Sequence, residues 1–485
     1  AALARLAAAR KDDLRLELHL RALYETPCPT CRRPVQPEYF VWQKEPPALT
    51  ARVIHCPHCG SGGEFPPASR DGQQAEAYGR SGLQYALALD RAAPLGDPDR
   101  EYALEALAVY PPRAIYVLFT LILKLETLEL PPSERRAAHA LLLGALDAGA
   151  GLSSHPDPLP RPRQLSLPAH YREYNLWLAL ERSAEAWEEA AAGAAPPAEA
   201  VTIFSGPLRD LAAAALAAAA PAARPVCAIA ALPRPAPAFW TLCALWSAWL
   251  WGAGAAGREA AAEFRPMLRR KRYDWTWHAL ALRAAAESAA ALLPEGATFV
   301  GLMPEAEPGF LAAALAAFGG AGFALRGLAQ QADPDEAQIL WQKADPPSPA
   351  PPPDAAAAPA AAVRDLLRQR GEPARWPALH AAALSALVVA PTPDSDAQSA
   401  LRALQAAAES AISERADLMH WGGEKEPESG HWWLRDPADA LPPLADRVEA
   451  EVVNRLVRAQ ADGWQEDALH EAVCAAFPGL LTPEP

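Results

Sequence analysis

The hydrophobic pattern of this chain changes near residue 200, and its two parts predict different elements. Between residues 75 and 200, apolar positions recur every three or four residues, as in REYALEALAVYPPRAIYVLFTLILKLETL, SERRAAHALLLGAL and YREYNLWLALERSAEAWEEA. This spacing is typical of amphipathic helices, so a helical region is expected there. Pro111 and Pro112 interrupt the first segment, because proline is not tolerated in the interior of a helix.

Short apolar runs follow beyond residue 200. VTIFSG, PVCAIAAL, ATFVGLMPE, GFALRGLAQQ and EAQILWQK are typical of strands, and helical segments separate the first four. Strands that alternate with helices predict a parallel sheet covered by helices. The last two strands have no helix between them and should pair as a hairpin. We therefore expect an α/β domain over residues 201–345.

Composition sets the remaining boundaries. Residues 346–362 are almost entirely proline and alanine, which predicts a linker. Residues 363–485 are typical of helices around a Gly-Glu-Pro turn with a short WWL strand, so we expect a winged-helix-like module there. Residues 1–25 predict a helix that leads into a cysteine-rich segment at 26–66. Because the first residue is alanine and no signal segment follows, we expect the chain to continue from a preceding part of a longer protein.

The charge of the chain limits its partners. The 485 residues include 58 acidic and 44 basic side chains, for a net charge of -14. This balance excludes a general affinity for polyanions, so nucleic-acid contact requires a local basic patch. One patch can bind phosphates while a tryptophan stacks on an unpaired base, and a solvated loop above packed tryptophans is the open alternative. Its residues are Arg265, Arg269, Arg270, Lys271, Arg272 and Trp275.

An uncharged segment from Pro235 to Gly257 raises the question of a membrane. Its length is close to the 20 or so residues that a spanning helix needs. Gly252, Gly254 and Gly257 interrupt the apolar run in its second half, so a buried helix is favoured over a membrane span. We expect a cytoplasmic protein without a membrane partner.

Four of the seven cysteines form two C-x2-C pairs, Cys28 with Cys31 and Cys56 with Cys59. Two such pairs, separated by strand-like runs, predict a zinc ribbon in which four thiolates hold one ion. The alternative is two disulfides, but cysteines at this spacing rarely form relaxed ones. A shell of four thiolates leaves no position for a catalytic water, so the predicted zinc is structural.

Four stretches between residues 25 and 345 resemble adenine-specific DNA methyltransferases that carry a zinc-ribbon insertion. They are CPTC…CPHCG with YFVW between, VYPPRAIYVL, PVCAIAALPRPAPAFWTLCALWSAWLWG, and HALALRAAAESAAALLPEGATFVGLMPE followed by GFLAAALAAFGGAGFALRG. The resemblance implies the class I methyltransferase fold, whose sheet ends in a hairpin. It also implies S-adenosylmethionine as methyl donor and DNA as partner.

The chain departs from this family where the chemistry lies. The family has an Asp-Pro-Pro-aromatic loop after a strand, and its carboxylate holds the amino group of a flipped adenine. The equivalent stretch here, Ala231–Pro235, has no carboxylate. The glycine-rich donor turn is not seen, so S-adenosylmethionine is expected only if a preceding part of the protein supplies its site. LDAGAG, residues 146–151, is similar to that turn, but its alanine- and leucine-rich context favours a helix end.

We therefore expect an α/β protein with a Rossmann-like methyltransferase sheet, a zinc-ribbon insertion, a helical region and a C-terminal winged-helix-like module. It is expected to be a DNA adenine methyltransferase-like protein that is inactive or incomplete, with no catalytic residue assigned. The alternative is a non-catalytic nucleic-acid-binding or scaffolding protein that retains the fold. Glu305 and Glu307 follow a strand at the edge where such sheets bind ligands, although capping the next helix is the simpler interpretation. His278 is expected to be a helix-start or core residue.

Overall fold

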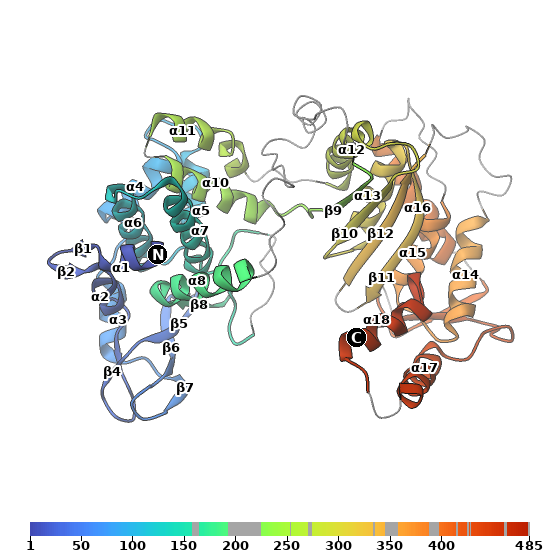
Figure 1. The fold of residues 1–485 in the computed structure, drawn as a ribbon, viewed down its shortest axis with the longest axis horizontal. Coiled ribbons are helices and arrows are strands. Elements are labelled where there is room, and N and C mark those ends of the chain that lie inside the picture. The colour runs from blue at the N-terminus through green and yellow to red at the C-terminus, as the bar shows by residue number, and fades with distance from the viewer. Residues whose placement is uncertain are drawn as a thin grey trace. The chain divides into compact units, whose positions relative to one another are not determined.

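The chain is a mixed α/β protein whose computed structural model has several small sheets. The structure describes residues 1–157, 164–192, 225–252, 254–269, 274–332, 335–344, 357–387, 397–413, 416–423, 426, 428–459 and 463–483. The chain forms two compact units, Ala1–Val201 with Ala236–Arg272, and Thr202–Pro235 with Tyr273–Pro485 (Figure 1). Each unit has its own hydrophobic core and is described by itself.

Helices dominate the first unit. The break at Pro111 and Pro112 is confirmed, and Pro112 occupies the first position of the following helix, where its missing N–H costs nothing. The helices are α1 (Ala2–Ala8), α2 (Leu16–Ala22), α3 (Ser69–Glu76), α4 (Leu83–Ala92), α5 (Arg100–Leu107), α6 (Pro112–Thr127), α7 (Pro132–Gly149), α8 (Leu176–Ala192), α10 (Pro237–Trp251), α11 (Ala255–Ala262) and the 3-10 helix η3 (Arg265–Arg269).

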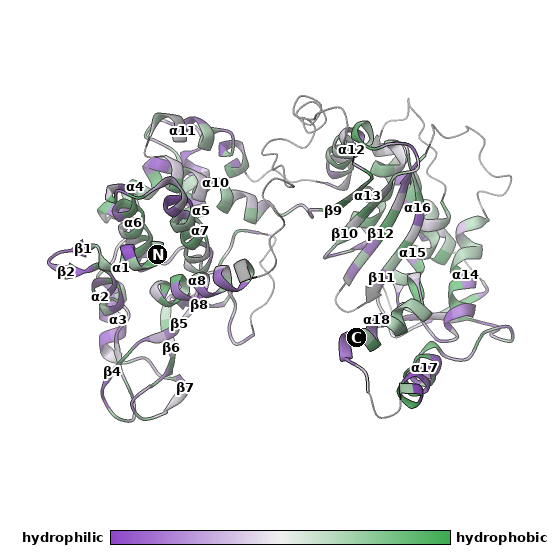
Figure 2. Ribbon diagram, viewed as in Figure 1, coloured by the Kyte–Doolittle hydropathy of each residue, from purple (hydrophilic) through white to green (hydrophobic). Residues whose placement is uncertain are grey.

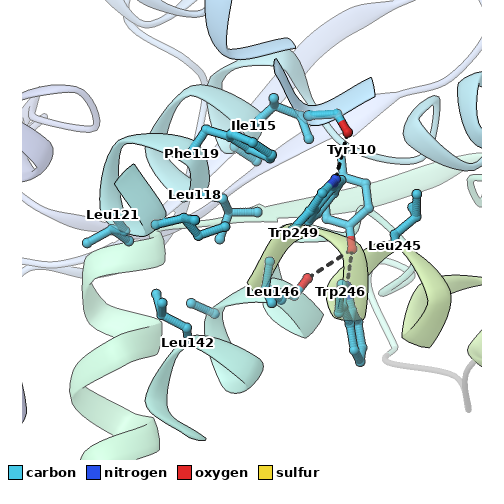
Figure 3. Close-up of a cluster of buried hydrophobic side chains, with 14 of the residues drawn as sticks. Tyr110, Ile115, Leu118, Phe119, Leu121, Leu142, Leu146, Leu245, Trp246 and Trp249 are labelled. Atoms are coloured by element: carbon cyan, nitrogen blue, oxygen red, sulfur yellow. Dashed lines mark hydrogen bonds between the residues drawn. The ribbon is translucent and has the colours of Figure 1, made fainter. Parts of the chain in front are cut away.

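The tryptophan-rich segment forms α10 and is buried in the core of the first unit (Figure 3). The Trp246 indole donates to the Tyr110 hydroxyl at 2.7 Å, and the Trp249 indole donates to the Ala88 carbonyl at 2.9 Å. The Tyr110 hydroxyl donates in turn to the Leu146 carbonyl at 3.2 Å. The predicted buried helix is confirmed, but it belongs to the first unit and not to the α/β domain expected over residues 201–345.

Helix α7 runs through the segment that is similar to a donor-binding turn. It continues to Gly149, where the Leu118 and Tyr110 side chains pack so closely that a Cβ would lie 3.0 Å from Leu118. The helix-end interpretation of residues 146–151 is therefore confirmed.

No single described helix is long and apolar enough to cross a membrane. Helices α5 and α6 pass the length and composition test only when they are taken together, and they are bent by 108° relative to each other.

The first unit also carries an antiparallel sheet in the order β7-β6-β5-β8. The last of these strands corrects the sequence prediction, because YREY was expected to begin a helix. Instead it pairs with β5, and α8 begins only after Asn175, whose side-chain oxygen accepts from the Trp177 N–H. The strands are β1 (Arg10–Lys11), β2 (Leu14–Arg15), β3 (Thr26–Pro27), β4 (Pro34–Val35), β5 (Pro37–Gln43), β6 (Ala48–His55), β7 (Gly62–Phe65) and β8 (His170–Tyr174).

The second unit contains a four-stranded sheet of β9 (Cys227–Ala231), β10 (Thr298–Met303), β11 (Phe323–Ala332) and β12 (Asp335–Lys343), in the order β11-β12-β10-β9. Strands β9 and β10 are parallel, and the predicted hairpin of β11 and β12 is confirmed. Gly301 admits the Trp341 ring, since a Cβ there would lie 2.5 Å from it. The strand predicted at VTIFSG lies outside the described residues.

Helices α12 (Trp275–Leu292) and α13 (Pro308–Gly320) pack on this sheet and share its core with the C-terminal helices. Much of this core is green, and therefore apolar, in Figure 2. The C-terminal module is thus not a separately tethered body, because α16 packs directly on α12 and α13. Of the predicted linker, residues 346–356 lie outside the described residues, and Ala358 already begins a helix.

The C-terminal module places three helices before a hairpin. Gly371, at φ 71°, ends the first helix in the left-handed conformation, which agrees with the predicted turn. A single antiparallel bridge joins Ala374, between the first two helices, to Trp432 of the hairpin. The elements are α14 (Ala358–Arg370), α15 (Trp376–Ala386), α16 (Ala397–Ser413), β13 (Leu418–Trp421), β14 (His431–Leu434), α17 (Leu444–Ala459), α18 (Glu466–Ala476) and the 3-10 helix η5 (Gly479–Leu481).

Candidate functional site

The four paired cysteines converge on one point in the first unit. The sulfurs of Cys28 and Cys59 lie 3.7 Å apart, as do those of Cys31 and Cys56. All four sulfurs lie within 4.8 Å of one another. Four thiolates about 2.3 Å from one tetrahedral zinc ion would be about 3.8 Å apart. The thiols therefore have the spacing of a zinc site.

Two similar turns present these thiols. The Cys28 N–H donates to the Arg33 carbonyl, and the Cys56 N–H donates to the Ser61 carbonyl, each at 2.8 Å. The residue four positions after each leading cysteine is left-handed, Arg32 at φ 66° and Gly60 at φ 72°. Gly60 adopts this conformation without cost because it has no Cβ, whereas Arg32 adopts it at a penalty.

The protonation of the thiols supports metal binding. The backbone N–H groups of Cys31 and Thr30 donate to the Cys28 sulfur and lower the pKa of Cys28 to about 6. The Ser61 N–H lowers the pKa of Cys59, but burial and the neighbouring thiols raise it to about 12, so a bound metal must displace a proton from the site. His58 is exposed and is not one of the grouped ligands, so the fit requires only the four cysteines.

A buried ion pair connects the ribbon sheet to the helices, and sequence reasoning missed its role. Arg113, in the YPPR segment, donates from Nε and Nη2 to the two oxygens of Glu173, each at 2.8 Å. The two side chains are 1% and 2% exposed. Trp42 donates to the same carboxylate at 2.6 Å, and the guanidinium lies 4.7 Å from the Phe40 ring centre. The arginine thus links α6 to β5 and β8. The only indication in the sequence was that Arg113 lies between apolar residues, which is unusual for an exposed arginine.

A second arginine lies at the carboxyl edge of the sheet in the second unit. Arg234, three residues after the end of β9, binds both Glu305 and Glu307, with the Nη2 to Glu307 distance at 2.8 Å. Glu307 is the N-cap residue of α13, but its side chain makes no cap hydrogen bond, so the predicted capping role is corrected. The Ala231–Pro235 loop thus places the Arg234 guanidinium at the edge of the sheet where sheets of this kind bind ligands.

His278 is buried next to this loop, and Trp275 is partly buried and packs against the same core. Burial lowers the pKa of His278 to about 4, and its ring lies 5.2 Å from the Phe310 ring. Trp275 stacks on Phe310 at 5.7 Å and covers Gly309, where a Cβ would lie 2.2 Å from the indole nitrogen. The expected core position of His278 is confirmed. Trp275 is engaged within the protein instead of being presented to a base.

The described arginines of the predicted basic patch have acidic partners. Arg265 pairs with Asp97 at 2.5 Å, and Arg269 pairs with Asp99 at 2.6 Å. Their charges are therefore balanced inside the first unit, which weakens them as phosphate ligands. Residues Arg270, Lys271 and Arg272 lie outside the described residues.

Comparisons with protein-family models, with curated proteins and with solved structures found no significant match. The resemblance to DNA methyltransferases therefore rests on the stretches of sequence that carry it.

Proposed function

We propose that this chain is a methyltransferase-like protein of the adenine-specific DNA methyltransferase type that serves as a non-catalytic scaffold. Three features support the likeness. They are a four-thiol cluster with ribbon strands, an arginine in the YPPR segment that ties this ribbon to α6, and a sheet with parallel β9 and β10 that ends in a hairpin. The Rossmann-like methyltransferase fold is part of this proposal.

The proposal that the protein is non-catalytic rests on the ion pairs that Arg234 forms with Glu305 and Glu307. Methylation of adenine needs an acceptor for the amino hydrogens just after the strand, so that the nitrogen lone pair is free to attack. This loop supplies a guanidinium, which can only donate hydrogen bonds. The two nearby carboxylates, Glu305 and Glu307, are already bound to it. The edge is therefore unsuited to hold an adenine amino group.

Calorimetry tests this assignment on the chain of 485 residues. We expect no heat when S-adenosylmethionine is added at millimolar concentration, to the wild type or to the Arg234→Gln variant. Saturable binding to the wild type that S-adenosylhomocysteine displaces would instead support a working enzyme.

A nucleic-acid-binding role is the second candidate, and the order of elements in the C-terminal module favours it. A helix, a bridged residue, two helices and a hairpin follow one another, as a winged-helix-like unit requires. Its third helix, α16, would be the one that enters a DNA groove. That helix carries one arginine, Arg402, and one glutamate, Glu409. Its charge gives little attraction for phosphates, so scaffolding remains the first proposal.

A gel shift separates the two roles. If nucleic acid binds, the affinity should fall as salt rises, and neutralising Arg270, Lys271 and Arg272 together should weaken it further. Arg402→Gln tests α16 separately, and it should weaken binding if this helix enters the groove. Binding that ignores both salt and the triple substitution would exclude phosphate contact through this run.

A further inference from the structure

The second unit contains a cavity that the proposed function does not use. It has a volume of about 760 Å³ and lies between β11, the turn from α14 to α15, β14, α17 and η5. This size is within the range of small-molecule sites. The apolar residues that line the cavity include Pro377, Ala378, Leu444, Val448 and Leu480.

Hydrogen-bond donors without partners border the same cavity. Arg375 lines it, is exposed, and has no hydrogen-bond or ion-pair partner within the described part of the chain. Arg370 also lines it, and the Nε of this side chain is buried without a partner. The first turn of α15 follows directly after Arg375; Pro377 has no N–H, but the Ala378 N–H lies in this turn, where the helix dipole favours negative charge. These groups together favour a negatively charged ligand.

The acidic groups at the cavity do not cancel this preference. Glu372 is already engaged, since it pairs with Arg370 at 3.1 Å and accepts from the Ala445 N–H at 3.3 Å. Glu428 is exposed. The Glu428 carboxylate would repel an extended polyanion, so a compact anion fits the cavity better than a nucleic acid.

Gln330 on β11 gives an independent indication of a ligand. It lines the cavity and is only 9% exposed, and its Oε1 atom is buried without a hydrogen-bond partner. An unpaired buried carbonyl is costly, so native structures usually provide it with a donor. A ligand that carries an N–H or O–H group would supply the missing donor.

We propose that this cavity binds a small organic anion, a carboxylate or phosphate monoester with an apolar body and one hydrogen-bond donor. Arg375 and the first turn of α15 bind the anionic group. Leu444, Val448 and Leu480 cover the apolar body. The Oε1 atom of Gln330 accepts the donor hydrogen. This site is separate from the edge at Arg234 and does not depend on the proposed methyltransferase likeness.

Titration calorimetry on the full-length protein tests the proposal with four probes. 4-Hydroxyphenylacetate and 4-hydroxyphenyl phosphate both carry the required groups, and comparing them tells whether the site prefers carboxylate or phosphate. Inorganic phosphate lacks the apolar body, and benzyl alcohol lacks the charge. We expect saturable binding of at least one of the first two, and weaker binding of the others. Failure of both organic anions to bind at millimolar concentration would overturn the proposal.

Three variants locate the binding. Arg375→Gln should weaken the best probe about tenfold, because it removes a charge-assisted hydrogen bond. Arg402→Gln removes the same charge from α16, away from the cavity, and should leave the affinity unchanged. Gln330→Leu should weaken binding without lowering the unfolding temperature of the free protein, since it removes an unpaired polar atom. Unchanged affinity in Arg375→Gln, or an equal loss in Arg402→Gln, would refute the site.

Discussion

Two arginine–carboxylate clusters, one in each unit, differ in burial and therefore in what they do. Arg113 and Glu173 are 1% and 2% exposed, and they join a helix to two strands. Arg234 is 14% exposed, and its partners Glu305 and Glu307 are 56% and 27% exposed. A fully buried pair must be complete, since either partner alone would leave a buried charge. A partly exposed ion pair stabilises a protein little. The Arg234 cluster is therefore important because it occupies the carboxyl edge of the sheet, and not because it stabilises the fold.

Removal of the metal should have the largest effect and should break only the first cluster. The ribbon strand β5 contributes Phe40 and Trp42 to the surroundings of Arg113. A structural zinc ion in a small site contributes on the order of 10 kcal/mol to folding. We expect Cys28→Ser, or a strong chelator, to unfold the ribbon and to loosen the packing around Arg113, as measured by metal content and by tryptophan fluorescence.

Cys227→Ser is the matched control for this experiment, because Cys227 is an exposed cysteine of β9 in the second unit. Its zinc content should equal that of the wild type. One zinc ion retained by Cys28→Ser would contradict the four-thiolate site.

Breaking the buried pair should have the next largest effect. Arg113→Met leaves the Glu173 carboxylate without its bidentate partner inside the protein. We expect a loss of about 3–5 kcal/mol in the free energy of unfolding, measured by denaturant titration. The double variant Arg113→Met with Glu173→Leu should recover much of this loss. A single variant as stable as the wild type would show that the pair is not a structural link.

Acid should weaken the second unit through His278. Its pKa is lowered to about 4 in the folded state by burial, while the unfolded chain titrates near the ordinary value of 6.5. Between these values the unfolded state binds more protons, so stability is lost as pH falls from 6.5 to 4. The full loss is about 3 kcal/mol for this group. Unfolding curves at several pH values should show this slope, and His278→Phe should reduce it. Part of the slope should remain, because burial also lowers the pKa of His380 in the same unit to about 4.

Breaking the exposed cluster should have the smallest effect on stability. We expect Arg234→Gln to change the free energy of unfolding by less than about 1 kcal/mol, because its partners are partly hydrated. The contrast with Arg113→Met, measured by the same denaturant titration, sharpens the comparison. A loss as large as that of Arg113→Met would show that the Arg234 cluster is also a structural link.

The elements that depend on local residue spacing could be predicted from the sequence. The elements whose conformation depends on partners far away in the chain could not. The cysteine pairs, the break at Pro111 and the terminal hairpin follow from local spacing, and the structure has all three. The YREY segment forms β8 because β5, more than 120 residues earlier in the chain, is available for pairing. The tryptophan-rich helix packs in the first unit, where the Tyr110 hydroxyl and the Ala88 carbonyl accept hydrogen bonds from two of its indole N–H groups.

The same limit applies to the candidate site. The absence of a carboxylate in Ala231–Pro235 was visible in the sequence, but the occupation of the edge by Arg234 depended on two glutamates about 70 residues later. The charged run after Arg265 suggested a phosphate-binding patch, whereas Asp97 and Asp99 pair with its first two arginines. Ion pairs between residues so far apart in the sequence depend on the tertiary fold, and the local sequence pattern does not show them.

Transfer of a radiolabelled methyl group from S-adenosylmethionine to adenine in DNA tests the central claim most directly. The full-length wild-type protein and its Arg234→Gln variant are assayed side by side on the same adenine-containing duplexes. The account predicts no transfer above background for either protein, because the loop after β9 offers no acceptor for the adenine amino group. Labelled N6-methyladenine formed by the wild type would contradict it.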